Sequence, residues 1–136
     1  MSNGSPEEEY KELNNNLRFY GNMRFAQLTL FSAVTAALLT FIFKLDPPLD
    51  EPIKTALKIG GLISTFVFWV MEERSTGYAL YFKKRIDELE KLLGYRQWQG
   101  RRMGTEAIFS ATNAVRFLYF SVAVLWLLTI LWRSAF

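Results

Sequence analysis

Three long apolar runs dominate this chain and constrain what it can fold into. The first, residues 25–43, has 19 residues without a charge and is bracketed by Arg24 and Lys44. A helix of that length matches the roughly 20 residues that are needed to cross a hydrocarbon core about 30 Å thick. A soluble core would instead distribute its apolar residues at amphipathic spacing. The runs therefore predict an all-α membrane protein.

The other two runs predict two further transmembrane helices. The second has only 13 consecutive uncharged residues, and it reaches a usable length over 55–71 when Lys54 and Lys58 extend to the headgroups. The third run, 111–132, is the most apolar and has Arg116 one turn inside its start. We expect three spans in a single membrane domain that covers the whole chain of 136 residues.

Local signals predict where the helices begin and end. Ser5 is suited to cap an amphipathic N-terminal helix, with Pro6 and three glutamates in its first turn, that leads into the first span. Gly21 and Asn22 are candidates for a kink before the membrane. Pro47 and the proline after it end the first span, because proline lacks an N–H donor and disfavours a helix before it. The second helix is expected to begin near Pro52.

The second helix is predicted to continue out of the membrane as a cytosolic extension, residues 72–93, because only Gly77 interrupts it before Gly94. One side of this extension carries five apolar residues at spacings of three and four. Since one small chain is not expected to bury them, we interpret them as an oligomer interface. They are Tyr78, Phe82, Ile86, Leu89 and Leu93. The arginine-rich stretch 95–104 is expected to lie at the membrane interface.

The distribution of Lys and Arg predicts the orientation. The N-terminal segment and the segment between the second and third spans together carry 12 when Arg116, one turn inside the third span, is counted with them, against 4 in the other two segments. The positive-inside rule places the N-terminus and residues 72–110 in the cytoplasm and the C-terminus outside. The N-terminus lacks the pattern of a secretory signal, so the first run is expected to stay as an anchor.

Small residues share a face on the first two spans, which permits either close helix packing or the lining of a pore, and packing is favoured. In the first span they are Thr29, Ser32, Ala33, Ala36 and Thr40; in the second they are Gly60, Gly61, Ser64 and Thr65.

Charged residues stand at the ends of the second and third spans. Glu72 and Glu73 leave the membrane where Arg116 enters it, and we expect an interfacial salt bridge, because charge at this depth is costly unless it is paired or reaches water. The alternative is that each side chain extends separately to the headgroups. Glu106, Ser110 and Asn113 share a face, and two roles are open for them, the lining of a cytosolic vestibule or the capping of the third helix, of which capping is favoured.

The composition excludes most catalytic and metal chemistry. The chain has no cysteine and no histidine, which removes thiolate nucleophiles, imidazole bases and nearly all zinc, copper or haem ligation. It also lacks a P-loop and a Gly-x-Ser-x-Gly motif. We therefore expect no enzyme activity, no cofactor and no metal. The net charge of +3 comes from basic residues beside the apolar runs, which favours lipid headgroups over nucleic acid as partners.

A set of aromatic, small and polar positions runs from the end of the second span to the start of the third: Phe68-Trp69-Val70-Met71, Ser75, Tyr78, Tyr81, Ile86, Leu89-Glu90 and Phe109-Ser110-Ala111-Thr112-Asn113. Through these positions, residues 62–132 resemble the RipA-like family of small bacterial inner-membrane proteins. The resemblance implies three spans, a cytosolic helical extension and a ring-like homo-oligomer, an octamer. A second, fainter similarity is to the SLATT effectors, which join membrane helices to a cytosolic helix and are thought to form pores.

Two functional hypotheses follow. In the first, the protein is a scaffold that assembles with itself in the bacterial inner membrane and organises lipid or partner proteins. In the second, the oligomer is a channel or pore gated by its cytosolic helices. The absence of a charged ring favours the scaffold, and the Thr/Ser face of the first span favours the pore.

Overall fold

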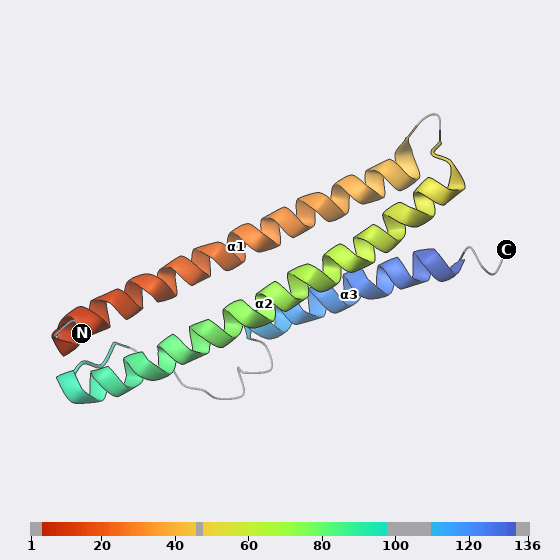
Figure 1. Cartoon of the computed structure of the whole chain (residues 1–136). Helices are drawn as coiled ribbons and strands as arrows, with labels where there is room; N and C mark the ends of the chain where they lie inside the picture. Colours follow the sequence, from red (N-terminus) through yellow and green to blue (C-terminus); the bar gives the residue numbers. More distant parts are fainter. Residues whose placement is uncertain (1–3, 46–47, 98–109, 133–136) are drawn as a thin grey trace.

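The computed structural model describes residues 4–45, 48–97 and 110–132. These residues form three helices and no strand: α1 (Pro6–Lys44), α2 (Glu51–Leu93) and α3 (Ala111–Leu131) (Figure 1). Each helix is long and apolar enough to cross a membrane, as predicted. α1 and α3 both pack along α2, whereas no described Cα atom of α1 lies within 8 Å of one in α3. α2 is therefore the central helix.

Helix length separates the membrane part of the molecule from the rest. α3 has 21 residues and, at 1.5 Å per residue, spans about 32 Å, which matches one crossing. α1 has 39 residues and α2 has 43, so they are roughly twice as long as a crossing requires. α3 lies beside only the half of α2 that is nearer to α1's C-terminal end (Figure 1).

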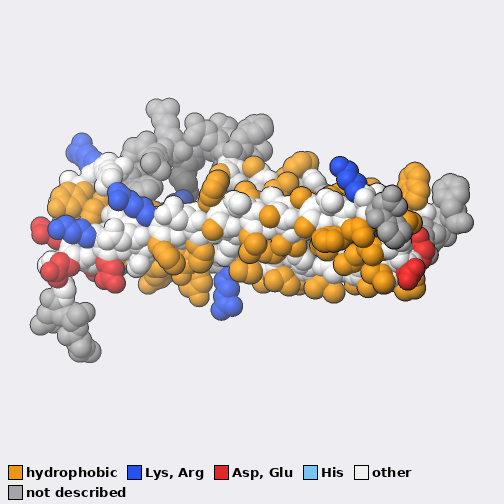
Figure 2. Space-filling model, turned by 90° about the horizontal axis from the view of Figure 1, so that it is seen from above, with side chains coloured by type: hydrophobic (Ala, Val, Ile, Leu, Met, Phe, Trp, Pro, Cys, Tyr) orange, Lys and Arg blue, Asp and Glu red, His pale blue; other side chains and the backbone are white. Residues whose placement is uncertain are grey.

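The other halves of α1 and α2 form an antiparallel pair that we call the helical arm, residues 6–24 and 72–93. Most charged side chains gather at the end of the molecule that holds the arm, and apolar side chains cover the stretch toward the opposite end (Figure 2). This division agrees with three spans joined to a helical extension.

The predicted start and stop signals are present. The Ser5 hydroxyl accepts a hydrogen bond from the Glu8 N–H at 3.3 Å, and the Glu8 carboxylate accepts one from the Ser5 N–H at 3.2 Å, which completes a capping box. Gly94 ends α2 in the left-handed conformation, with a φ of 74°, and its N–H donates to the Glu90 carbonyl.

α1 differs from the prediction at Gly21, where it continues as one helix through the expected kink. A glycine inside a helix costs only about 1 kcal/mol relative to alanine, and the packing of α1 on α2 on both sides of this position offsets that cost. α2 likewise runs from its span into the extension as one helix, as predicted. Of the expected connection 95–104, residues 98–104 lie outside the described part of the chain.

The arm buries much of its own apolar stripe. Ile86 and Leu89 are 1% and 3% exposed and pack against Tyr10 and Leu13 of α1. Phe82, Leu93 and Leu17 border this cluster, whereas Tyr78 stays exposed. The expectation that one chain cannot bury the stripe is therefore wrong for Ile86 and Leu89, because α1 folds back along the extension and covers them.

The spans pack around three aromatic residues. Phe31 of α1 and Tyr119 and Trp126 of α3 are almost fully buried. The ring of Phe31 lies 4.7 Å from that of Tyr119 and 5.5 Å from that of Phe68, measured between ring centroids. α1 and α3 thus touch through these side chains over the surface of α2.

Candidate functional site at the membrane boundary

Four charged residues meet where the spans join the arm, and we call this cluster the polar junction. Arg24 directly precedes the uncharged run of α1, Glu72 and Glu73 directly follow the run of α2, and Arg116 lies in the second turn of α3. Two positive and two negative side chains at one depth give a cluster with no net charge.

The first pair of the polar junction is buried. The Arg24 Nε donates to the Glu72 Oε1 at 2.8 Å, and its Nη2 contacts the same oxygen. The Glu72 side chain is only 2% exposed and the Arg24 side chain 24%. The Arg24 Nη2 also lies 3.4 Å from the Thr112 hydroxyl. One guanidinium therefore links all three helices.

The second pair is more accessible and has a bidentate geometry. The Arg116 Nε and Nη2 donate to the two carboxylate oxygens of Glu73 at 2.6 and 2.7 Å. Both side chains are more than 40% exposed. The Trp69 indole N–H also donates to Glu73, at 3.4 Å. The expected salt bridge with Arg116 is present for Glu73, whereas Glu72 pairs with Arg24, a partner that was not predicted.

The polar junction is suited to fixing helix positions and not to chemistry. Each carboxylate is neutralised by a guanidinium, so neither is placed as a general base. Among the described residues, no group of three or more Asp, Glu, His or Cys side chains is arranged to hold a metal ion. Burying an ion pair costs desolvation energy, but breaking one that is already buried costs more, because it strands a charge. The pair therefore favours one register of α1 against α2.

The two small-residue faces have different surroundings. Gly61 and Thr65 are buried where the Trp126 ring lies on α2, so this part of the face is a contact between spans of one chain. Ser64 is partly buried, and Gly60 is exposed with open space beside it.

On α1 the small-residue face stays uncovered. Thr29, Ser32 and Thr40 are exposed, and their hydroxyls donate to carbonyls four residues earlier in α1 at 3.0, 2.9 and 2.8 Å. Ala36 and Ala33 are also exposed. Because the hydroxyl protons are satisfied within the helix, this face tolerates either lipid or a close helix neighbour.

Polar contacts close the far end of the arm. The Tyr10 hydroxyl donates to the buried carboxylate of Glu90 at 3.0 Å. The amide oxygen of Gln97 also lies 3.0 Å from the Tyr10 hydroxyl oxygen. Burial, and then the bond to Glu90, raise the pKa of Tyr10 above its usual value. The Arg85 guanidinium binds both oxygens of Glu9, at 2.7 and 3.3 Å. That pairing raises the pKa of Arg85.

Ser110 accepts a hydrogen bond from the Asn113 N–H at 3.3 Å and so caps α3, as predicted.

No protein-family model, curated protein or solved structure matches this chain. The resemblance to the RipA-like family therefore stays a prediction, and the residues themselves carry the functional inferences below.

Proposed function

We propose that this chain is a non-enzymatic protein of the bacterial inner membrane that assembles with itself and acts as a scaffold for lipid or partner proteins. The observation that carries the proposal is an apolar groove on the arm. Its volume is about 610 Å³, and its walls include Tyr78, Tyr81, Phe82 and Tyr20. Tyr81 is 65% exposed beside it.

The apolar side chains of this surface lie far enough from the membrane to contact water, and this contact is unfavourable. Tyr81 and Leu92 lie 10 and 21 residues beyond Met71, which is about 15 and 32 Å along a helix. Headgroups extend only roughly 5–8 Å beyond the hydrocarbon core on each side. Both side chains therefore reach water, where burying a large apolar side chain in an interface gains about 1.5–3 kcal/mol.

These residues also share one side of α2. Tyr78, Tyr81 and Leu92 are spaced by 3 and 11 residues, which places them within about 60° around a helix of 3.6 residues per turn. We call this surface the outer arm face. It adjoins the stripe of Ile86 and Leu89, which α1 already covers, and shares with that stripe only its exposed member, Tyr78. The outer arm face therefore replaces that stripe as the proposed contact between copies.

The orientation in this proposal follows from charge. The 11 basic residues of the N-terminal and 72–110 segments support an arm in the cytoplasm and a C-terminus outside. The uncovered Thr29, Ser32, Ala36 and Thr40 face gives a second place for close contact between copies, within the membrane.

The test is the oligomer mass of the full chain in mild detergent, measured by light scattering with detergent correction. We expect a multiple of 15.8 kDa for the unchanged protein and a shift toward the single-chain mass for Tyr81→Asp with Leu92→Asp. Leu80→Asp is the matched control, because Leu80 is also exposed on α2 but points about 100° away from Tyr81. A monomeric unchanged protein overturns the assembly, and a double variant that keeps the oligomer mass overturns the outer arm face as the contact between copies.

A flux assay separates the scaffold from a pore. In liposomes that carry the assembled protein, the scaffold predicts no release of trapped ions above that of empty liposomes. Ion release that scales with protein and is lost in Thr40→Val would replace the scaffold with the channel hypothesis.

A further inference from the structure

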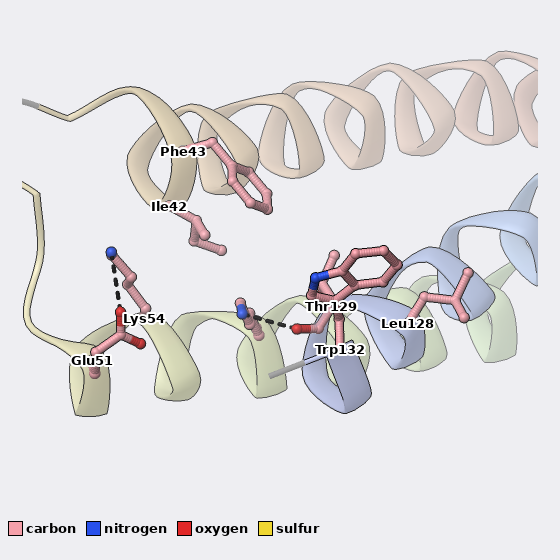
Figure 3. Close-up of a pocket in the computed structure, with 8 residues that line it drawn as sticks. Ile42, Phe43, Glu51, Lys54, Leu128, Thr129 and Trp132 are labelled. Carbon is pink, nitrogen blue, oxygen red and sulfur yellow. Dashed lines mark hydrogen bonds and ion pairs between the residues drawn. The ribbon is translucent and has the colours of Figure 1, made fainter. Parts of the chain in front are cut away.

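A pocket opens at the end of the molecule that is opposite to the arm. It has a volume of about 600 Å³ and lies between the last turn of α1, the first turns of α2 and the last turn of α3. Figure 3 shows Ile42 and Phe43 pointing from α1 toward the side of the pocket formed by α3, where Leu128 and Trp132 lie. Its walls are therefore mostly apolar.

Two lysines of α2 supply the charge of this pocket. The Lys58 ammonium donates to the Thr129 carbonyl at 2.9 Å, in the last turn of α3, where carbonyls commonly take partners from outside the helix. The Lys54 ammonium lies 3.4 Å from Glu51, which is longer than the roughly 2.7–2.9 Å of a strong charge-assisted hydrogen bond. Two ammonium groups against one carboxylate leave the lining with a net positive charge, and Lys54 has donors for a further anion.

The depth of the pocket indicates its occupant. Phe43 is the last residue of the uncharged run of α1, and Lys58 directly precedes the uncharged run of α2. The lysines therefore stand at headgroup level, while Leu128 and Phe43 face the acyl region. A soluble anion would leave the apolar walls unused, and a zwitterionic lipid would bring its own cation to the lysines.

We propose that this pocket binds one anionic phospholipid, with its phosphate on Lys54 and Lys58 and the start of one acyl chain against Phe43, Leu128 and Trp132. Basic pockets between transmembrane helices recognise anionic headgroups in this way. All lining residues belong to one chain, so the inference requires membrane insertion but not the assembly proposed above.

Native mass spectrometry of the full chain in mild detergent tests the proposal. Phosphatidylglycerol and phosphatidylcholine with the same acyl chains are added in turn, and retention of phosphatidylglycerol is expected to be higher. Lys54→Gln should lower that retention about fivefold, the equivalent of about 1 kcal/mol for one lysine near a lipid surface. Lys83→Gln, which removes an exposed lysine of the arm, is the matched control and should change nothing.

Equal retention of the two lipids by the unchanged protein overturns the proposal, as does unchanged retention in Lys54→Gln. Lys54→Arg keeps the charge and should keep the preference, which separates loss of charge from loss of folding. Phe43→Ala should weaken retention of phosphatidylglycerol because it removes part of the apolar wall. Glycerol phosphate at the same concentration should not displace the lipid; displacement would identify a site for free phosphate and overturn the lipid assignment.

Discussion

The indole ring of Trp126 lies directly on the backbone of α2 at Gly61. A Cβ atom at position 61 would stand 2.8 Å from the ring Cδ2 and closer still to two other ring carbons. Trp126 is fully buried, so its ring cannot turn away from position 61 without disturbing the side chains that cover it. The neighbouring Gly60 has nothing within 4 Å of the same hypothetical atom. The approach of α3 to α2 therefore depends on the missing side chain at position 61 alone.

Alanine at these two adjacent positions should have opposite effects. Gly61→Ala overfills the contact, and overpacking typically costs about 1–3 kcal/mol. Gly60→Ala meets open space and should stabilise α2 by up to about 1 kcal/mol, because alanine loses less backbone entropy in a helix. Thermal unfolding in detergent measures both. If Gly61→Ala unfolds at the same temperature as the unchanged protein, Trp126 does not pack on α2 as described.

The two ion pairs of the polar junction should differ in strength. Arg24→Ala leaves Glu72 buried without its partner, and stranding a buried charge costs about 3–5 kcal/mol. Arg116→Ala removes an exposed pair, for which about 0–1 kcal/mol is typical. Unfolding free energies of the two variants in the same detergent test this order.

Replacing both members of the buried pair provides the control. Arg24→Met together with Glu72→Met removes the charges but keeps much of the volume, so it should be closer in stability to the unchanged protein than Arg24→Ala alone. Equal losses for Arg24→Ala and Arg116→Ala would contradict the difference in burial between the two pairs.

The sequence predicts the architecture well because a membrane imposes length and charge rules on each helix separately. The three helices that are long and apolar enough to cross a membrane, the cap at Ser5 and the stop at Gly94 all follow from local residues. Gly21 misled the prediction of a kink, since packing on α2 outweighs the small local cost of a glycine.

The contacts between helices were harder to predict, because a stripe shows that a surface is buried but not what covers it. A signal was nevertheless present. Tyr10 lies 15 residues before the first uncharged run, and Ile86 lies 15 residues after the end of the second. In an antiparallel pair of helices, two residues that lie the same number of residues from their uncharged runs lie at the same distance from the membrane and so face each other. The same rule pairs Arg24 with Glu72, each adjacent to its run.

Ile86→Asp should open the arm and leave the spans in place. The carboxylate would enter the cluster of Tyr10, Leu13 and Leu89, where an unpaired charge is strongly unfavourable. Hydrogen exchange should then accelerate by at least tenfold in residues 6–20 and 80–93 but not in 25–43. Leu80→Asp serves as the control, because Leu80 is 56% exposed. Unchanged exchange in both arm segments would show that α1 does not cover Ile86.

Tyr10 should make the closure of the arm sensitive to alkaline pH. Its pKa is raised above the ordinary value of 10.0 by burial and by Glu90. A group whose pKa is higher in the folded state stabilises that state fully below its unfolded pKa, and the contribution is lost as the pH rises through the raised value. Phenolate at this position would face the Glu90 carboxylate and lie beside Tyr95, whose ring centroid is 5.3 Å away.

Limited proteolysis of the arm at pH 8 and at pH 11 measures this loss, with faster cleavage between residues 6 and 20 expected at the higher pH. Strongly alkaline solution acts on the whole molecule and not on Tyr10 alone, so Tyr10→Phe is the necessary control. Phenylalanine keeps the contacts with Leu13 and Ile86 but has no proton to lose, and it leaves Glu90 without the hydroxyl. The variant should therefore be less stable at pH 8 and should show a smaller change between the two pH values. An equal pH response in the two proteins would mean that the opening is driven by other groups and that Tyr10 does not titrate within the closed arm.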